Sequence, residues 1–390
     1  MSDTLPKGWK WVKLGEIAEI KGGKRLPKGI LLTTKKTPYP YIRITDFKGH
    51  KIDLSNIMYV DEDTRKVISK YTVNKQDIIL SIVGTFGLCA IVPNELDNAN
   101  LTENCVKFVF DKTKIDTNFL YYHLISPDTQ ELIKSLDVGS TQPKLPIYNI
   151  QKIDILLPPI HEQKAIAEVL SSLDDKIDLL HRQNKTLEEM AMTLFRQWFI
   201  EPTKDGLPEG WEIGKFGENL KIVYGKNLPT SKLKDSGYPV FGANGKIGYY
   251  IEYMYEEPQV LISCRGTAGK VNISDPKSYI TNNSFVLEKT INENISFEYL
   301  KYYCLNYDFT QFVTGSVQPQ ITIEELNNAE ILIPPNILIN KFSKIISNFE
   351  TKIFSNKIQI QTLDKIRDIL LPKLMSGEVR VKVENNELKG

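Results

Sequence analysis

The sequence predicts a mixed α/β protein in which two repeated α/β domains are separated by two long antiparallel coiled-coil helices, with pseudo-twofold symmetry. Three observations support this fold class. The chain repeats itself, each repeat has β-rich runs with one aromatic helix, and each repeat ends in a long segment whose apolar positions alternate in steps of four and three. With 390 residues and 41% hydrophobic content, the chain can form more than one hydrophobic core.

The internal repeat extends over most of the chain. Residues 5–9, Leu-Pro-Lys-Gly-Trp, return as Leu-Pro-Glu-Gly-Trp at 207–211. Later motifs recur in the same order with smaller offsets, namely 81–87 with 263–269, 139–143 with 315–319, and 157–159 with 333–335. A duplication of this length predicts two copies of one module, and therefore two similar binding surfaces related by a pseudo-twofold axis.

Each globular part is predicted to be a mixed α/β domain. The β-rich runs at 77–83 and 259–263 lie between clusters of Gly, Pro and Asn, and one aromatic helix per copy is expected at 118–126 and 298–306. The predicted organisation is an α/β domain at 1–157, a helical segment at 158–204, a second α/β domain at 205–333, a second helical segment at 334–378 and a charged tail at 379–390.

The helical segments carry a coiled-coil seam. Apolar positions alternate in steps of four and three over residues 166–198, and the alternation recurs, shifted by 176 residues, over 342–374. Proline pairs at 158–159 and 334–335 set where the helices begin, because proline is tolerated only in the first turn of a helix. Matching seams predict that the helices pack head to tail and hold one domain at each end of a rod of about 50 Å.

Polar residues interrupt the seam at three places. Asn184 and Asn356 are seam positions in the first and second helix, and Arg367 is a further interruption in the second. A buried asparagine can fix the register of a coiled coil. The alternative is that each asparagine reaches solvent at the edge of the seam.

Composition narrows the class of protein. No apolar run approaches the ~18 residues of a membrane span and the first ten residues are too polar for a secretory signal, which together predict a cytoplasmic location. The four cysteines form no Cys-x-x-Cys pair, so we expect buried thiols rather than a zinc site or disulfides. Net charge is +1, but residues 7–36 hold nine Lys or Arg against two acids, which fits either a nucleic-acid contact or a solvated surface.

The sequence shows no catalytic machinery. Residues 242–246 and 266–270 resemble the end of a phosphate-binding loop but lack its upstream glycine and its Ser or Thr. The proline pairs are preceded by Leu157 and Ile333, so there is no Asn-Pro-Pro-Tyr or Asp-Pro-Pro-Tyr tetrapeptide of an amino-methyltransferase. The four histidines are scattered and are predicted to have surface or helix-face roles. We therefore predict no catalytic and no metal-ligating residue.

Polar, glycine-rich segments at corresponding places in the two copies are the candidate DNA contacts. Glycine lets backbone N–H groups approach phosphate, while Asn, Gln and Arg side chains read base edges. Lys24 and Lys226, each beside a glycine, are expected on phosphate. The predicted set is Lys24, Arg25, Arg43, Thr85, Asn104, Gln142 and Lys144 in the first copy and Lys226, Asn227, Asn244, Arg265, Thr267, Asn283, Gln318 and Gln320 in the second.

Two interpretations of these segments remain open. Arg43, Asn104 and Gln142 in the first copy, and Arg265, Asn283 and Gln318 in the second, either read bases or hold the reading loops. The matching glycines are better explained as turn residues required by the fold. Positions that differ between the copies, such as Val83 against Arg265, are predicted to determine specificity, because readers of different sequences should diverge where they touch bases.

The whole chain resembles the specificity subunits of type I restriction-modification systems. Each copy closes with Gly-Ser-x-Gln-Pro, a hydrophobic strand and Pro-Pro before a long helix. Residues 158–164, Pro-Pro-Ile-His-Glu-Gln-Lys, resemble the start of that family's first conserved helical region, and residues 370–378 resemble the end of the second. The sequence departs at 336–340, which lacks the Glu-Gln step found at 162–163.

This resemblance implies a function without catalysis. It implies two target-recognition domains that read the two halves of a bipartite, asymmetric site in double-stranded DNA. Two modification subunits that carry S-adenosylmethionine would dock on the chain, two restriction subunits with ATP and Mg²⁺ can join, and this chain itself would hold no cofactor. The alternatives are a coiled-coil scaffold without DNA specificity and a self-contained DNA methyltransferase or nuclease. Neither the target bases nor the spacer length follow from the sequence.

Overall fold

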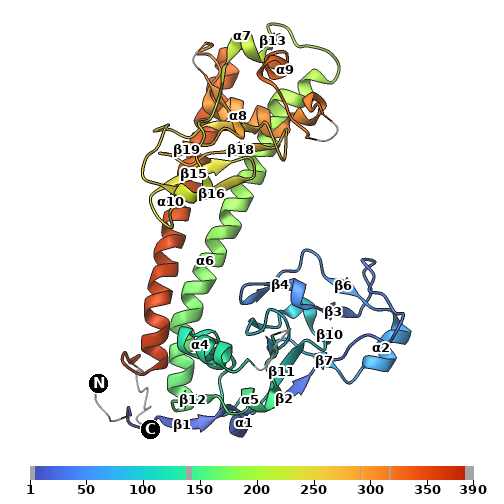
Figure 1. Cartoon of the computed structure of the whole chain (residues 1–390), viewed down its shortest axis with the longest axis vertical. Coiled ribbons are helices and arrows are strands. Elements are labelled where there is room, and N and C mark those ends of the chain that lie inside the picture. Colours follow the sequence, from blue (N-terminus) through green and yellow to red (C-terminus); the bar gives the residue numbers. More distant parts are fainter. Residues whose placement is uncertain (1–4, 138–142, 290, 316–317, 383–390) are drawn as a thin grey trace, which may run out of the picture. The chain divides into compact units, whose positions relative to one another are not determined.

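The computed structural model describes residues 5–137, 143–289, 291–315 and 318–382 and forms two compact units (Figure 1). Unit 1 comprises Met1–Leu179 with Gln359–Gly390, and unit 2 comprises Leu180–Ile358. Each unit therefore holds one α/β domain and part of each long helix. None of the described helices combines the length and the apolar composition that a membrane span requires.

Unit 1 is built on two four-stranded sheets. The antiparallel sheet has the order β2-β11-β8-β9, and the mixed sheet, in which β3 runs parallel to β10, has the order β6-β3-β10-β7. Two short pairs, β1 with β12 and β4 with β5, complete the strands. Their bounds are β1 Lys10–Lys13, β2 Glu19–Gly22, β3 Pro40–Ile42, β4 Phe47–Lys48, β5 Lys51–Ile52, β6 Met58–Tyr59, β7 Thr72–Val73, β8 Ile78–Ser81, β9 Cys89–Ile91, β10 Ala99–Leu101, β11 Cys105–Val109 and β12 Asp154–Leu157.

Strand β8 is covered on both faces, which explains the run of three apolar residues Ile78, Ile79 and Leu80. Successive side chains of a strand point to opposite faces of the sheet. Ile78 and Leu80 pack in the main core of unit 1, whereas Ile79 packs in a second core with Ala99 and Leu101 of the mixed sheet. Because both faces of β8 are covered, every residue in it is buried.

The helices of unit 1 include the predicted aromatic helix. It is α3, whose N-cap Asp116 accepts a hydrogen bond from the Phe119 N–H, and Pro127 at the first position of α4 ends it. His123 lies on the buried face of α3, so of the two predicted alternatives, a surface or a helix-face position, the second applies to this histidine. The bounds are α1 Leu14–Ile17, η1 Ile44–Asp46, α2 Glu62–Ile68, η2 Asn94–Leu96, α3 Thr117–Ile125, α4 Pro127–Ser135 and α5 Ile147–Ile150.

Unit 2 repeats this arrangement. Its antiparallel sheet has the order β14-β20-β17-β18, matching β2-β11-β8-β9, and its second sheet β16-β15-β19 again contains one parallel pair, β15 with β19. The strands are β13 Glu212–Lys215, β14 Lys221–Tyr224, β15 Tyr238–Gly242, β16 Gly245–Tyr250, β17 Val260–Ser263, β18 Val271–Ile273, β19 Tyr279–Ile280, β20 Ser284–Glu288 and β21 Glu330–Ile333. The shorter helices are α7 Phe216–Asn219, η5 Thr230–Lys232, α8 Phe297–Asn306, η6 Phe309–Phe312 and α9 Ile323–Asn327. The internal repeat is thus confirmed at the level of sheet order.

The two predicted long helices are present. Helix α6 spans Ile160–Phe195 and continues through the π-helical turn η3 (Arg196–Ile200) into η4 (Glu201–Thr203), while α10 spans Asn336–Met375. Each begins directly after its proline pair, as predicted. Within unit 2 the helices run antiparallel, because the earlier Asn184 of α6 meets the later Asn356 of α10 while Phe195 meets Phe342.

The seam asparagines pair with each other instead of reaching solvent. Asn356 Nδ2 donates to Asn184 Oδ1 at 2.8 Å, and both side chains are buried. In unit 1 the other interruption, Arg367, forms an ion pair with Asp174 of α6 at 3.0 Å. The first alternative, polar groups that fix the register, is therefore the one the structure supports. The four cysteines are buried free thiols, as predicted.

Candidate nucleic-acid interface

In unit 1 the chain after β2 crosses the ends of β10 and β11 at close range. The Gly23 N–H donates to the Cys105 carbonyl and the Lys24 N–H donates to the Leu101 carbonyl, both at 2.9 Å. A Cβ added to Gly23 would lie 2.0 Å from the Thr102 carbonyl oxygen, so only glycine allows this approach. The crossing fixes the main chain that carries Lys24 and Arg25.

Other predicted residues of unit 1 border the same strand ends. Thr85 is exposed in the turn that follows β8. Main-chain contacts bring Asn104, Arg43 and Lys144 to the same place. The Ile82 N–H donates to the Asn104 carbonyl at 2.8 Å, and Val83 forms a β-bridge with Lys144. The Thr102 N–H donates at 3.1 Å to the carbonyl of Ile42, the residue before Arg43. The structure thus gathers residues that are distant in the sequence. Gln142 lies outside the described residues.

Unit 2 has the same main-chain crossing at the equivalent strand ends. The Gly225 N–H donates to the Ser284 carbonyl at 3.0 Å and the Lys226 N–H to the Ile280 carbonyl at 2.9 Å, and a Cβ on Gly225 would lie 2.2 Å from the Thr281 carbonyl oxygen. Lys226 and Asn227 are therefore held as Lys24 and Arg25 are. The neighbours are again brought in by main-chain contacts, from the Cys264 N–H to the Asn283 carbonyl at 3.0 Å and through a β-bridge between Arg265 and Gln320. Gln318 is exposed in the same segment as Gln320.

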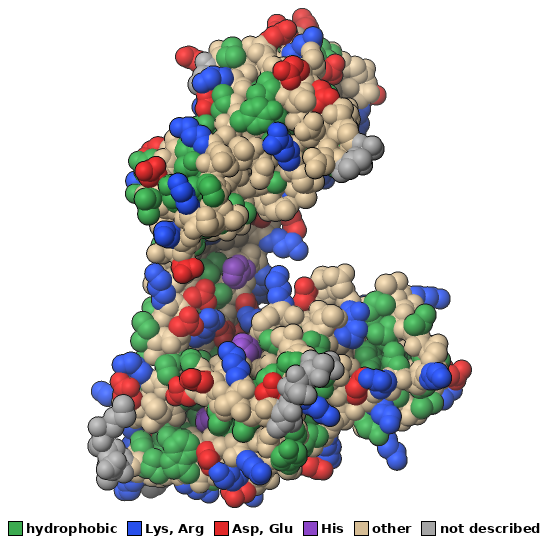
Figure 2. All heavy atoms as spheres, in the orientation of Figure 1, with side chains coloured by type: hydrophobic (Ala, Val, Ile, Leu, Met, Phe, Trp, Pro, Cys, Tyr) green, Lys and Arg blue, Asp and Glu red, His purple; other side chains and the backbone are tan. Residues whose placement is uncertain are grey.

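Charges on these surfaces are mixed. Figure 2 shows Lys and Arg side chains interspersed with Asp and Glu on the drawn face of each unit. In the basic segment 7–36, Lys21 pairs with Glu19 at 2.9 Å and Arg25 with Glu103 at 2.6 Å. Burial acts to raise the pKa of Glu103, but the hydrogen bonds from Arg25, from the Glu103 main chain and from Thr102, together with the charge of Arg25, outweigh burial, and the pKa is lowered. Lys24 has no ion-pair partner among the described residues, which leaves its charge available to a phosphate.

Arg43 is engaged within the fold. Its guanidinium contacts Asp46 through Nη2 at 2.5 Å and Nε at 3.2 Å, and Nη2 also donates to the Asn56 carbonyl at 2.9 Å. The Asp46 side chain is buried and accepts the Arg43 N–H as well. Of the two roles predicted for Arg43, holding a loop is the one that this geometry favours.

The glycines of the two matching turns have the backbone conformation expected of turn residues. Gly84 and Gly87 have φ of +74° and +88°, and Gly266 and Gly269 have φ of +76° and +87°. Residues that have a Cβ rarely adopt positive φ values of this size. In unit 1 the turn is closed by Ser81, whose Oγ donates to the Thr85 carbonyl at 2.8 Å.

Residues 242–246, which resemble the end of a phosphate-binding loop but lack its upstream glycine and its Ser or Thr, belong to a β-hairpin. They form the tip of the β15–β16 hairpin, where Gly242 pairs with Gly245. The tip is held by Ser263, which begins the repeated segment 263–269, and by Asn272; neither is in the predicted set of DNA contacts. A Gly-Ala-Asn-Gly tetrapeptide between two aromatic runs was the available hairpin signal.

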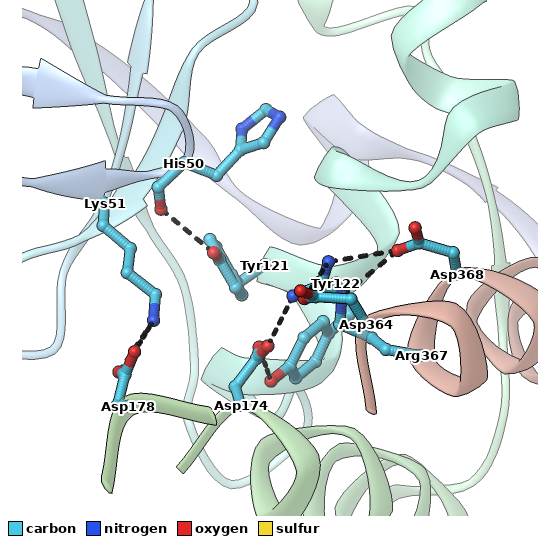
Figure 3. A network of polar contacts seen from close by, with 9 residues as sticks. All are labelled: His50, Lys51, Tyr121, Tyr122, Asp174, Asp178, Asp364, Arg367 and Asp368. Atoms are coloured by element: carbon cyan, nitrogen blue, oxygen red, sulfur yellow. Dashed lines mark hydrogen bonds and ion pairs between the residues drawn. The ribbon is translucent and has the colours of Figure 1, made fainter. Parts of the chain in front are cut away.

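The β4–β5 hairpin of unit 1 is tied to its helices by a polar network (Figure 3). Lys51 Nζ contacts Asp178 Oδ1 of α6 at 2.6 Å, and the Tyr121 hydroxyl donates to the His50 carbonyl at 3.0 Å. Asp174 lies between Tyr122 and Arg367, at 2.7 Å and 3.0 Å respectively. The α/β domain of unit 1 is thereby fixed on the helix that follows it. The described residues contain no group of three or more His, Cys, Asp or Glu arranged for a metal ion.

Comparison with known proteins identifies the family. The family model for the type I restriction modification DNA specificity domain matches residues 6–189 and 208–365. The chain belongs to this family. It is 28% identical to the specificity subunit of the type I restriction enzyme MjaIX of Methanocaldococcus jannaschii, over 97% of this chain and 95% of that one. It is 22% identical to the HindI specificity subunit of Haemophilus influenzae, over 95% and 99% of the two chains.

A solved structure shares the fold of this specificity subunit. The S subunit of a type I restriction-modification system from M. genitalium matches with a TM-score of 0.62 and 21% identity, covering 96% of this chain and 97% of that one. The resemblance inferred from the sequence is therefore confirmed. The family consists of DNA-recognition subunits without catalysis of their own, which agrees with the expectation that this chain is not an enzyme.

Proposed function

We propose that this specificity subunit reads a bipartite, asymmetric DNA site, with each unit reading one half. The proposal rests on one observation: the two units share the same main-chain crossings but carry different loops on them. Ile42 accepts the Thr102 N–H as Phe241 accepts the Thr281 N–H, so the two positions are equivalent. Arg43 then enters a 3₁₀ turn, η1, whereas Gly242 enters the β15–β16 hairpin.

This divergence determines the symmetry of the target. Two identical readers would select two equal half-sites, as dimeric DNA-binding proteins do. Readers that share a frame but differ in their loops select unequal half-sites, because base contacts carry sequence information while phosphate contacts position the protein. The long helices α6 and α10, which contribute to both units, would then set the length of the unread spacer between the halves.

The chemistry would come from partner chains. The relatives are named as subunits of type I restriction enzymes. We place two modification subunits on this chain, with S-adenosylmethionine bound to them, and two restriction subunits can join with ATP and Mg²⁺. This chain would hold no cofactor, and it would act in the cytoplasm, where the genome that it reads is found. The family match gives no support to a scaffold without DNA specificity or to a self-contained methyltransferase or nuclease.

The experiment is to express the chain with its modification subunit and to map N6-methyladenine in the DNA of the cell. A single motif with two unlike half-sequences and a fixed unread spacer is expected. The chain expressed without the modification subunit is the control, and it should yield neither methylation nor cleavage. A continuous or palindromic motif would contradict the proposal, as would turnover by the isolated chain.

A further inference from the structure

We propose that Asn244 reads an adenine in the major groove of the half-site bound by unit 2, and that Thr267 is the positioning residue that orients its amide. The inference rests on the proposed function and names the contact through which one half-site is recognised. It assigns separate roles to two residues of the predicted set.

Asn244 stands at the tip of a tight hairpin. Only Ala243 and Asn244 connect the paired residues Gly242 and Gly245, and Asn244 is exposed. Gly245 has a φ of +103°, a conformation that glycine adopts readily. A loop of this length projects one side chain outward with few alternative conformations.

The main chain at the tip is held from three directions. The Ala243 carbonyl is approached by Ser263 Oγ at 2.5 Å, Asn272 Nδ2 at 3.0 Å and Thr267 Oγ1 at 3.2 Å. Ser263 at the end of β17 and Asn272 on β18 donate to this carbonyl, while Thr267, in the turn between the two strands, lies beside it. A carbonyl surrounded in this way cannot rotate without losing several hydrogen bonds, so the position of Asn244 is fixed before any ligand arrives.

Thr267 also sets the orientation of the Asn244 amide. Its Oγ1 donates to Asn244 Oδ1 at 2.9 Å, shorter than its 3.2 Å approach to Ala243. With Oδ1 turned to the hydroxyl, the Nδ2 group is turned away, and it has no hydrogen-bond partner among the described residues. Oδ1 retains a second lone pair. The side chain therefore presents two donors and one acceptor in a fixed plane.

This pattern matches adenine. In the major groove adenine offers N7 as an acceptor beside the N6 amino donor, and an asparagine amide pairs with both at once. Guanine offers two acceptors, N7 and O6, so the Asn244 carbonyl would face an acceptor without a hydrogen atom between them. The surroundings suit a polyanion, since Lys246, Arg265 and Lys270 are all exposed nearby in the hairpin and the turn.

Unit 1 uses the equivalent residues differently. Thr85 occupies the repeat position of Thr267, and Ser81 that of Ser263. Ser81 Oγ donates to the carbonyl of Thr85 itself instead of to a hairpin tip. The Thr85 side chain has no counterpart of the Asn244 contact in the described part of unit 1, so the orientation of an amide by this threonine is specific to unit 2.

The test uses single-atom changes in the DNA. The complex of this chain with its modification subunit is bound to duplexes in which each adenine of the mapped site is replaced in turn by 7-deazaadenine, which lacks the N7 acceptor. We expect one adenine at which the replacement weakens wild-type binding by roughly 5- to 150-fold, the range of a good base contact. In Asn244→Ala, that one replacement should cause no further loss, while replacements elsewhere keep their effect.

The positioning role has its own readout. Thr267→Val should reduce the penalty at the same adenine, and Thr267→Ser should restore it. Thr351→Val, which changes an exposed threonine of α10 whose hydroxyl donates to the Ser347 carbonyl, is the control and should leave the penalty unchanged. The proposal is overturned if Asn244→Ala keeps the full penalty at every adenine, or if no adenine in the site is sensitive in the wild type. Failure of the proposed function would look different, because no duplex would then be bound in preference to any other.

Discussion

At the scale of single residues, His123 shows how burial turns one group into a source of pH dependence. It is buried on α3 with Nδ1 3.2 Å from Thr129 Oγ1 of α4, and burial lowers its pKa to about 4. A histidine in the unfolded chain titrates near ~6.5, so below that pH protons bind the unfolded state in preference to the native state. Unit 1 should therefore lose stability as the pH falls from ~6.5 towards 4.

The prediction is tested with His123→Asn, which can still reach Thr129 but does not titrate. Between pH 7.5 and pH 5, the wild type should lose about 2 kcal/mol more unfolding free energy than the variant. Urea unfolding at the two pH values measures this difference. His181→Asn on α6, outside the core, is the control and should keep the pH dependence of the wild type. Equal pH dependence in wild type and His123→Asn would contradict the assignment.

Lys24 and Lys226 test the division between phosphate and base contacts. Both are exposed and are held by equivalent glycine crossings. Replacing either with Ala in the complex with the modification subunit should weaken binding to every DNA sequence and reduce the slope of log K against log salt by about one unit. Binding titrations over a range of salt concentrations measure this slope. A loss confined to one base position would instead make the lysine a base reader.

At the scale of elements, equivalent tyrosines fasten each α/β domain to the long helix that follows it. Tyr122 of α3 donates to Asp174 Oδ2 on α6 at 2.7 Å, and Tyr302 of α8 donates to Glu350 Oε1 on α10 at 3.0 Å. The two units differ in the cation that pairs with this carboxylate. In unit 1 it is Arg367 of α10, which forms an ion pair with Asp174. Burial, followed by the nearby carboxylate, raises the pKa of both tyrosines, so they remain donors at neutral pH.

Removing one of these hydroxyls should therefore destabilise its unit. Tyr122→Phe and Tyr302→Phe each remove a hydrogen bond to a charged carboxylate and should lower the unfolding free energy by about 1.5 to 3 kcal/mol. Chemical denaturation followed by tryptophan fluorescence measures the effect. Tyr148→Phe, at an exposed position, is the matched control and should have no effect. Stability equal to the wild type in both variants would show that these bonds do not hold the domains.

The elements also show what the sequence could predict. The long helices, the aromatic helices and the buried strands β8 and β17 have a strong apolar pattern, and they were found close to their predicted places. The β15–β16 tip has no such pattern, and the residues that hold it, Ser263 and Asn272, are 20 and 29 positions from Ala243. Contacts of this kind depend on the folded arrangement. The residue type of Asn244 was enough to predict a DNA contact, but its position at a fixed hairpin tip could not be predicted from the sequence.

At the scale of the whole molecule, both long helices contribute to both units, and each unit has its own polar pair in the seam. Asp174 meets Arg367 in unit 1, and Asn184 meets Asn356 in unit 2. A polar group inside a seam finds its partner in only one register. Any change in helix length must therefore preserve the register in both units, which requires matched insertions of whole heptads in α6 and α10.

The proposed role of the helices predicts how the DNA site responds to such insertions. Three heptads added after Leu179 and after Ile358 would lengthen each helix by ~31 Å at ~1.5 Å per residue. This is about nine base-pair steps of ~3.4 Å, and it is close to one turn of DNA, so both the distance and the rotational phase of the second half-site are nearly recovered. Mapping N6-methyladenine should find the same two half-sequences with a spacer about nine base pairs longer.

Shorter and unmatched insertions make the comparison decisive. One heptad in each helix adds ~10 Å, or about three base pairs, and turns the second half-site by roughly a third of a DNA turn. The phase then fails although the seam is intact, so methylation should be weaker than with three heptads. Three heptads in α6 alone should disrupt the seam and lower the melting temperature. If the matched three-heptad protein is folded and still methylates sites with the original spacer, the helices do not set the distance between the half-sites.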